Sequence, residues 1–313
     1  MTLYLTERCN SRCRTCDYWR HGRADLDLAA VSRLLPSLRR LGTETAVLSG
    51  GEPLLNRDWA AIAALLGDAG LDVWLLTSGL SLAKHAQRAG ALFRAITVSL
   101  DGADPATYAA IRGVDAFDVV CKGIRAAADT GVNVTVRVTV QRTNFRQLTP
   151  LVDLTRRLGA RQISFLAVDV ANPHAFARGG DFESDLALRP GEIGELEERL
   201  LALEHERGEA FASGFIAESP RKLRRILHYF SAICGLGAYP PVRCNAPEFS
   251  AVVDAKGGVS PCFFIGGPAD ASVRDGLDEA LNHAEMASLR SAIRAGARAE
   301  CVTCVCSMWR NLN

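Results

Sequence analysis

The stretch CNSRCRTC at residues 9–16 sets Cys9, Cys13 and Cys16 in a C-x3-C-x2-C run, directly after a short apolar segment, LYLT at 3–6. Thiolates at this spacing can wrap one iron–sulfur cube, which normally takes four cysteines. The local run supplies three, so one iron would keep an open position where a ligand can bind and react. The alternative is a zinc knuckle with a fourth ligand nearby, for which His21 is the local candidate.

Composition limits the other possibilities. The chain has 313 residues, a net charge of +1, 48% apolar residues and ten cysteines. This length allows one sizeable barrel plus a smaller module. The charge gives no support for nucleic-acid or membrane partners, and neither a signal segment nor an apolar run of roughly 20 residues is present. We expect a cytoplasmic protein whose cysteines bind metal rather than form disulfides.

Strand and helix patterns alternate after the cysteine run. We expect strands at 2–6, 45–48, 72–77, 95–100, 132–140 and 162–168. Helices are expected at 28–41, 58–69, 81–90, 104–112, 116–130 and 146–158. Such alternation indicates an α/β fold with a parallel sheet and external helices, here a partial (βα)6 TIM-like barrel. In parallel barrels the chemistry lies at the carboxyl ends of the strands.

Glycines and polar residues occupy several of these strand ends. Ser49-Gly50-Gly51-Glu52-Pro53 follows the second strand, Thr77-Ser78-Gly79 ends the third, and Ser99 and Asp101 end the fourth. Glycine allows close backbone approach to a ligand, and hydroxyl or carboxylate groups can bond a ribose or a substrate. The glycines can equally be a turn, and Asp101 can equally be an N-cap or Asx turn before the helix at 104.

The fifth strand carries an arginine on its polar face. Thr135, Arg137 and Thr139 alternate with valines, so a period of two places all three towards the barrel lumen. A lumen arginine is costly unless it meets an anion, which could be a ligand carboxylate held bidentately. The alternative is a structural ion pair with Asp101 or Glu52.

Taken in order, CNSRCRTC, SGGEP at 49–53, TSG at 77–79 and SLDG at 99–102 make this chain resemble the radical S-adenosylmethionine (SAM) superfamily. The resemblance implies a four-iron cluster on the three N-terminal cysteines, with SAM on the open iron. In that family an electron from the cluster cleaves SAM to a 5′-deoxyadenosyl radical. Thr15 departs from the family, which usually has an aromatic residue there; this loosens the packing without removing a ligand.

The resemblance also implies roles for individual residues. The segment at 49–53 would hold the SAM amino group, and Arg137 would hold the SAM carboxylate. Asn144 is a further candidate that could be only a turn residue. The candidate cofactor-binding residues are Gly50, Gly51, Glu52, Thr77, Ser99, Arg137 and Asn144.

A second cysteine group follows in the C-terminal part. We expect a barrel at 1–170, a helical linker at 171–240 with helices at 191–207 and 219–234, and a cysteine-rich α+β module at 241–313. In that module a strand at 249–253 and Gly257-Gly258 suit a hairpin, and a helix is expected at 277–295. Its cysteines are Cys244, Cys262, Cys301 and Cys304. Four thiolates suit zinc equally well on geometry.

This arrangement resembles the twitch module, the half-length form of the SPASM extension of radical SAM enzymes. The resemblance implies one auxiliary four-iron cluster on these four cysteines, with Cys306 as a possible replacement for Cys304. The chain would then use two clusters, SAM and an external electron donor such as flavodoxin or ferredoxin.

The cysteine spacing is also similar to that of the twitch enzyme that oxidises an aminocyclitol in antibiotic biosynthesis. We therefore expect an oxidoreductase acting on a small polar substrate, with the auxiliary cluster as electron acceptor. Three alternatives stay open: a redox-neutral epimerase with Cys234 or Cys306 as hydrogen donor, a peptide-modifying maturase, and a non-catalytic zinc protein. The candidate catalytic residues are Cys234, Cys306 and Asp101.

Overall fold

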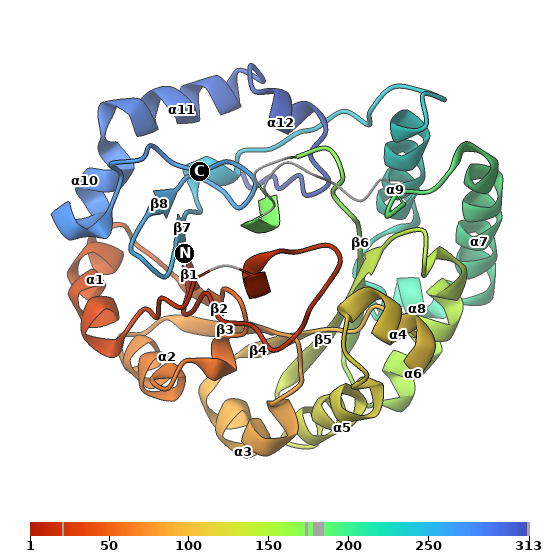
Figure 1. The fold of residues 1–313 in the computed structure, drawn as a ribbon, viewed down its shortest axis with the longest axis horizontal. Coiled ribbons are helices and arrows are strands. Elements are labelled where there is room, and N and C mark those ends of the chain that lie inside the picture. The colour runs from red at the N-terminus through yellow and green to blue at the C-terminus, as the bar shows by residue number, and fades with distance from the viewer. Residues whose placement is uncertain (21, 173–174, 178–184, 312–313) are drawn as a thin grey trace.

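The structure is a computed structural model that describes residues 1–20, 22–172, 175–177 and 185–311. Six parallel strands form the main sheet: β1 (Thr2–Tyr4), β2 (Thr45–Ser49), β3 (Asp72–Thr77), β4 (Ala95–Ser99), β5 (Asn133–Val140) and β6 (Gln162–Ala167). The helices that follow them are α1 (Leu28–Arg40), α2 (Trp59–Asp68), α3 (Leu82–Leu92), α4 (Pro105–Arg112), α5 (Phe117–Ala128) and α6 (Leu148–Arg157). Figure 1 shows these helices outside the curved sheet, so the predicted partial barrel is confirmed.

The sheet is open and has eight strands. Its order is β6-β5-β4-β3-β2-β1-β7-β8, which leaves β6 and β8 as its two edges. Strands β7 (Val252–Val253) and β8 (Val259–Ser260) form the predicted hairpin, whose turn contains Gly257 at φ +89°. Because β7 pairs in parallel with β1, the C-terminal segment extends the same sheet beyond the first strand.

Valines and polar residues alternate along β5, so the two kinds of side chain lie on opposite faces of the sheet. The valines are buried against the helices, and the intervening polar residues are half-buried on the other face. Val134, Val136, Val138 and Val140 thus join one continuous apolar core with the helices. The lumen face stays free for polar side chains, as the period of two predicts.

Helices α7 (Ile193–Glu206) and α9 (Pro220–Ile233) cover the β6 side of the sheet, with the short α8 (Gly208–Ala212) between them. Leu200, Leu203 and Leu223 pack against Val140 and Phe165 there. The edge of β6 is also covered by backbone, because the Ile163 amide donates to Phe215 and the Ala217 amide donates to Ile163. Among the described residues, no helix is long and apolar enough to cross a membrane.

Two local predictions differ from the structure. Asp104, not Asp101, is the N-cap of α4 and accepts from the Thr107 amide at 2.8 Å. The helix expected at 277–295 is broken at His283 into α10 (Leu277–Asn282) and α11 (Ala284–Arg294). The break allows both apolar faces to turn inward, with Leu277 and Met286 each buried. The short α12 (Ala299–Val302) follows.

Candidate active site and metal centres

The N-terminal cysteine loop is docked on two other segments. On one side the amides of Gly51 and Glu52 donate to the carbonyls of Thr6 and Arg8, both at 2.8 Å. On the other side the Arg12 amide donates to the Arg112 carbonyl at 3.0 Å, and the Arg14 amide donates to Ile111 at 3.1 Å. The loop is therefore fixed between the segment after β2 and the end of α4, within the ring of helices (Figure 1).

Glycines make this docking possible. Gly50 has φ +119°, and a Cβ there would lie 2.6 Å from the Thr6 carbonyl oxygen. A Cβ on Gly51 would overlap the Arg8 carbonyl, and one on Gly113, at φ +67°, would overlap that of Arg12. The predicted close backbone approach at Gly50 and Gly51 is directed at the cysteine loop itself.

The three thiols share one buried environment. Burial raises the pKa of Cys9 to about 11 and that of Cys16 to about 12, and it also raises the pKa of Cys13. Neighbouring thiols of the same run add to the increase at Cys9 and Cys16, and the Asp101 carboxylate adds to it at Cys13, while the Arg112 guanidinium lowers the pKa of each of the three. A metal centre that binds thiolates would therefore have a cation beside it.

A zinc ion and a four-iron cluster require different distances between the sulfurs of the cysteines that bind them. Tetrahedral zinc with Zn–S bonds of about 2.3 Å holds its sulfurs roughly 3.8 Å apart. Among the described residues, three or more His, Cys, Asp or Glu ligand atoms lie within 4.8 Å of one another only at the exposed Asp270, His283 and Glu285. Of the cysteines that the structure describes, no three sulfurs of either group lie that close to one another. His21 lies outside the described residues.

Glu52 is fully buried and joins β2 to the end of β3. Its Oε1 accepts from the Leu54 amide at 3.2 Å and the Thr77 hydroxyl at 2.8 Å. Its Oε2 accepts from the Ser78 amide at 2.7 Å and the Ser78 hydroxyl at 2.6 Å. A carboxylate offers about four lone-pair sites, so a further donor must displace one of these. The Ser78 hydroxyl can be displaced, because Asn10 Oδ1 lies 3.3 Å away as a second acceptor.

Arg137 lies in the middle of a polar row on the lumen face. Its register partners are Ser99 on β4 and Ser164 on β6. Its Nε is buried without a hydrogen-bond partner, and no ion pair to Arg137 is present in the part of the chain that the structure describes. The two carboxylates that the sequence offered are engaged elsewhere, since Asp101 pairs with Arg112 and Glu52 with the end of β3. Neither of these carboxylates therefore pairs with the Arg137 guanidinium.

Two other predicted residues serve the scaffold. The Asn144 amide donates to the carbonyls of Asp101 and Thr139 at 2.9 and 3.0 Å, and its Oδ1 accepts from the Gln141 amide at 2.8 Å. Asn144 is therefore the turn residue that the sequence allowed as the alternative. Asp101 accepts from the Thr139 amide at 2.7 Å and pairs with Arg112 at 3.2 Å.

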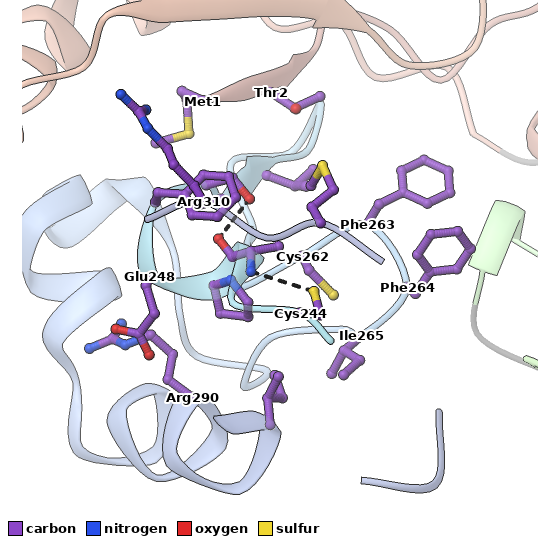
Figure 2. Close-up of a pocket in the computed structure, with 18 of the residues that line it drawn as sticks. Met1, Thr2, Cys244, Glu248, Cys262, Phe263, Phe264, Ile265, Arg290 and Arg310 are labelled. Atoms are coloured by element: carbon purple, nitrogen blue, oxygen red, sulfur yellow. Dashed lines mark hydrogen bonds between the residues drawn. The ribbon is translucent and has the colours of Figure 1, made fainter. Parts of the chain in front are cut away.

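The second cysteine group lines a cavity of about 760 Å³ beside the β1–β7 side of the sheet. Figure 2 shows Cys244 and Cys262 close together in it. Burial raises the pKa of Cys262 to about 11, and the Cys301 and Cys244 thiols add to it. The cysteines that line the cavity are Cys244, Cys262, Cys301, Cys304 and Cys306.

Two cysteines have other charged neighbours: Cys306, which also lines the cavity, and Cys234, which is not among its lining residues. Cys306 lies near Arg137 and Lys222, whose charges oppose the burial that raises the pKa of its thiol. The Cys234 thiol donates to the Leu188 carbonyl at 3.2 Å at the end of α9, and Glu192 is its charged neighbour. The structure therefore does not bring Cys234, predicted as a hydrogen donor, to either cysteine group.

A chain of aromatic rings connects the two cysteine groups. Tyr4 at the end of β1 meets Tyr18 edge-on at 5.8 Å and Phe263 at 6.3 Å between ring centroids. Phe263 directly follows Cys262, and Tyr18 lies two residues after Cys16. Burial raises the pKa of Tyr4, with both Cys16 and Cys262 adding to the effect. Sequence reasoning missed Tyr4 because nothing local distinguishes it from a core residue of a short strand.

Arg112 and Gly113 were also missed. Both lie at the end of a predicted helix, where arginine and glycine are common for local reasons. No sequence pattern indicates that this helix end meets a loop about a hundred positions earlier.

Comparison with known proteins gives three findings. Residues 3–154 match the family model described as the radical SAM superfamily. A GTP 3′,8-cyclase of Yersinia pestis is 36% identical over 162 residues, covering 49% of this chain and 50% of that protein. A probable GTP 3′,8-cyclase of Saccharolobus solfataricus is 32% identical over 177 residues, covering 53% and 56%. The chain spans about half the length of the curated relatives it matches.

Solved structures resemble the chain over more of its length. SuiB of Streptococcus suis bound to S-adenosylmethionine has a TM-score of 0.66 at 14% identity, covering 97% of this chain and 71% of that one. The anSMEcpe protein with bound AdoMet has a TM-score of 0.66 at 15% identity, covering 92% and 82%. At such low identity these matches support the shared fold alone.

Proposed function

We propose, on the premise that residues 3–154 belong to the radical SAM superfamily, that this chain cleaves SAM reductively and abstracts hydrogen from a small polar substrate. The observation that carries the proposal is the docked three-cysteine loop. It lies between the glycine segment after β2 and the end of α4, at the carboxyl ends of parallel strands, where barrel enzymes place their chemistry.

The chain's own residues fit the cofactors that this function needs. Cys9, Cys13 and Cys16 would ligate a four-iron cluster and leave one iron for SAM. Arg137, unpaired in the lumen, would grip the SAM carboxylate bidentately. Glu52 would accept from the SAM amino group once the Ser78 hydroxyl turns to Asn10. When bound, the cluster and SAM supply a radical that can take hydrogen from an unreactive C–H bond.

The second cysteine group would hold an auxiliary four-iron cluster. Cys304 is the preferred fourth ligand beside Cys244, Cys262 and Cys301, because its thiol has Cys244 and Cys262 as electrostatic neighbours. Cys306 is also a neighbour of Cys304 and Cys244, but its main charged neighbours are the cations Arg137 and Lys222. A fully ligated cluster would accept an electron from the substrate, which gives net oxidation of a sugar or aminocyclitol. A flavodoxin or ferredoxin would reduce the N-terminal cluster.

A second candidate is cyclisation of a purine nucleotide. Relatives at 32–36% identity are named GTP 3′,8-cyclase, and GTP is therefore a candidate substrate. A third candidate is a redox-neutral epimerase with Cys306 as hydrogen donor, because the lumen cation Arg137 is a charged neighbour of its thiol. The three functions differ in their products: an oxidised substrate, a cyclised nucleotide, or an inverted centre that gains hydrogen from solvent.

The test is anaerobic reconstitution followed by incubation with SAM, a reductant and cyclitols, sugars, GTP or peptides. We expect about eight irons per chain and no zinc, and 5′-deoxyadenosine that depends on one substrate class. The control is the triple variant Cys9→Ala/Cys13→Ala/Cys16→Ala, which should keep about four irons and form no 5′-deoxyadenosine. A zinc-loaded, iron-free protein, or continued cleavage of SAM by the triple variant, would contradict the proposal.

A further inference from the structure

Arg112 holds the cysteine loop through its backbone. Its carbonyl accepts from the Arg12 amide, and the carbonyl of Ile111 accepts from the Arg14 amide. These two bonds flank Cys13, which is the most buried of the three N-terminal cysteines. The last turn of α4 is therefore fixed against the middle of the loop.

The side chain of Arg112 carries a positive charge into the same place. It is only 13% exposed, and its partner Asp101, at 3.2 Å, is 2% exposed. Its Nε is buried and has no hydrogen-bond partner among the described residues. Because the Arg112 carbonyl accepts from the amide next to Cys13, this buried charge lies beside the cysteine loop, and the Asp101 carboxylate 3.2 Å from it partly neutralises it.

We propose that Arg112 is a positioning residue that raises the reduction potential of the N-terminal cluster, and that Asp101 lowers it. The inference rests on the proposed function. Reduction transfers one electron from a donor such as flavodoxin or dithionite to the cluster and makes the cluster more negative by one charge. Coulomb interactions are strong where water is excluded, so a buried cation favours the reduced state and a buried carboxylate opposes it.

The charges predict shifts of opposite sign. Arg112→Met should lower the ratio of reduced to oxidised cluster at a fixed potential by tenfold or more, which is about 59 mV for one electron. Asp101→Asn should raise this ratio. Arg112→Lys, which keeps the positive charge, should keep most of the wild-type ratio. The matched control is Arg142→Met, because Arg142 also forms a partly buried ion pair, with Glu192 at 3.1 Å, whose cysteine neighbour is Cys234 and not one of the N-terminal three.

The experiment is a potentiometric titration of each reconstituted variant monitored by electron paramagnetic resonance, with iron content measured in parallel. The signal that changes on addition of SAM is assigned to the N-terminal cluster. If the wild-type chain shows no such signal, the proposed function fails. If it does and Arg112→Met has the same potential, this inference alone is wrong. If Arg112→Met holds no iron, the potential of the Asp101→Asn variant is measured instead. A potential equal to or lower than that of the wild type would overturn the inference.

Discussion

Gly113 at the end of α4 lies against the carbonyl of Arg12, so closely that the two could not coexist if residue 113 had a Cβ. Gly113→Ala should therefore do more than add the cost of a left-handed backbone, about 1–2 kcal/mol. It should push the cysteine loop off α4 and reduce the iron held by the N-terminal group. The measurements are iron content and thermal unfolding of the reconstituted protein.

The connection between α5 and β5 contains a matched control position. Gly131 has φ +84°, and nothing lies within 4 Å of a Cβ built on it. Gly131→Ala should lower stability by a similar amount and leave the iron content unchanged. Equal iron loss in both variants would show that backbone strain alone, and not contact with Arg12, explains the result.

Arg137→Met should separate ligand binding from stability. Hydrogen bonds to charged groups contribute about 1.5–3 kcal/mol, so SAM affinity should fall roughly 10- to 100-fold. The protein without ligands should be at least as stable as before, because a buried, unpartnered Nε–H is removed. Equilibrium binding of SAM and an unfolding curve measure the two effects. A loss of stability with unchanged affinity would make Arg137 a structural residue.

Asn144→Ala should give the reverse result. It breaks three hydrogen bonds to buried backbone groups at the ends of β4 and β5, at a cost of about 2–3 kcal/mol. The folded fraction should still bind SAM with nearly wild-type affinity. A large loss of affinity without a change in the unfolding midpoint would return Asn144 to the ligand site.

Cys304→Ala and Cys306→Ala should differ in iron content. If Cys304 is the fourth auxiliary ligand, its loss should reduce the iron from about eight to about four per chain. Cys306→Ala should keep both clusters, because the charged groups that most affect its thiol are Arg137 and Lys222, ahead of Cys244. The opposite result would exchange the roles of the two cysteines.

The barrel strands could be predicted from the sequence because the local alternation of apolar and polar residues determines which of their side chains are buried. The period of two in β5 alone places Arg137 on the lumen face, and the structure agrees. The hairpin was predicted from Gly257-Gly258, whose backbone freedom is a local property. In both cases the residues that decide the structure are neighbours in the chain.

What the sequence could not predict depends on pairings between distant segments. Asp101 was expected to be an N-cap, an ion-pair partner of Arg137 or a catalytic group. In the structure Asp101 forms its ion pair with Arg112 instead, because α4 folds back towards the cysteine loop. Likewise the acceptor sites of Glu52 are filled by Ser78 and Thr77 from the neighbouring strand. No local pattern specifies which of several plausible partners a buried charge will meet.

The pairing of β1 with β7 has a consequence for the order of events on the ribosome. Strand β1 receives its second neighbour only when residues 252–253 emerge, after β2 to β6. Until then one edge of β1 has unpaired backbone groups that can recruit another chain. The bonds that dock the N-terminal cysteine loop on the segment after β2 and on α4 can form once residue 113 has emerged, whereas those of Asp17 with Phe176 and of Arg14 with Asp185 form later. The two proposed cysteine centres would thus be completed one after the other, the second only after β7 has covered the free edge of β1.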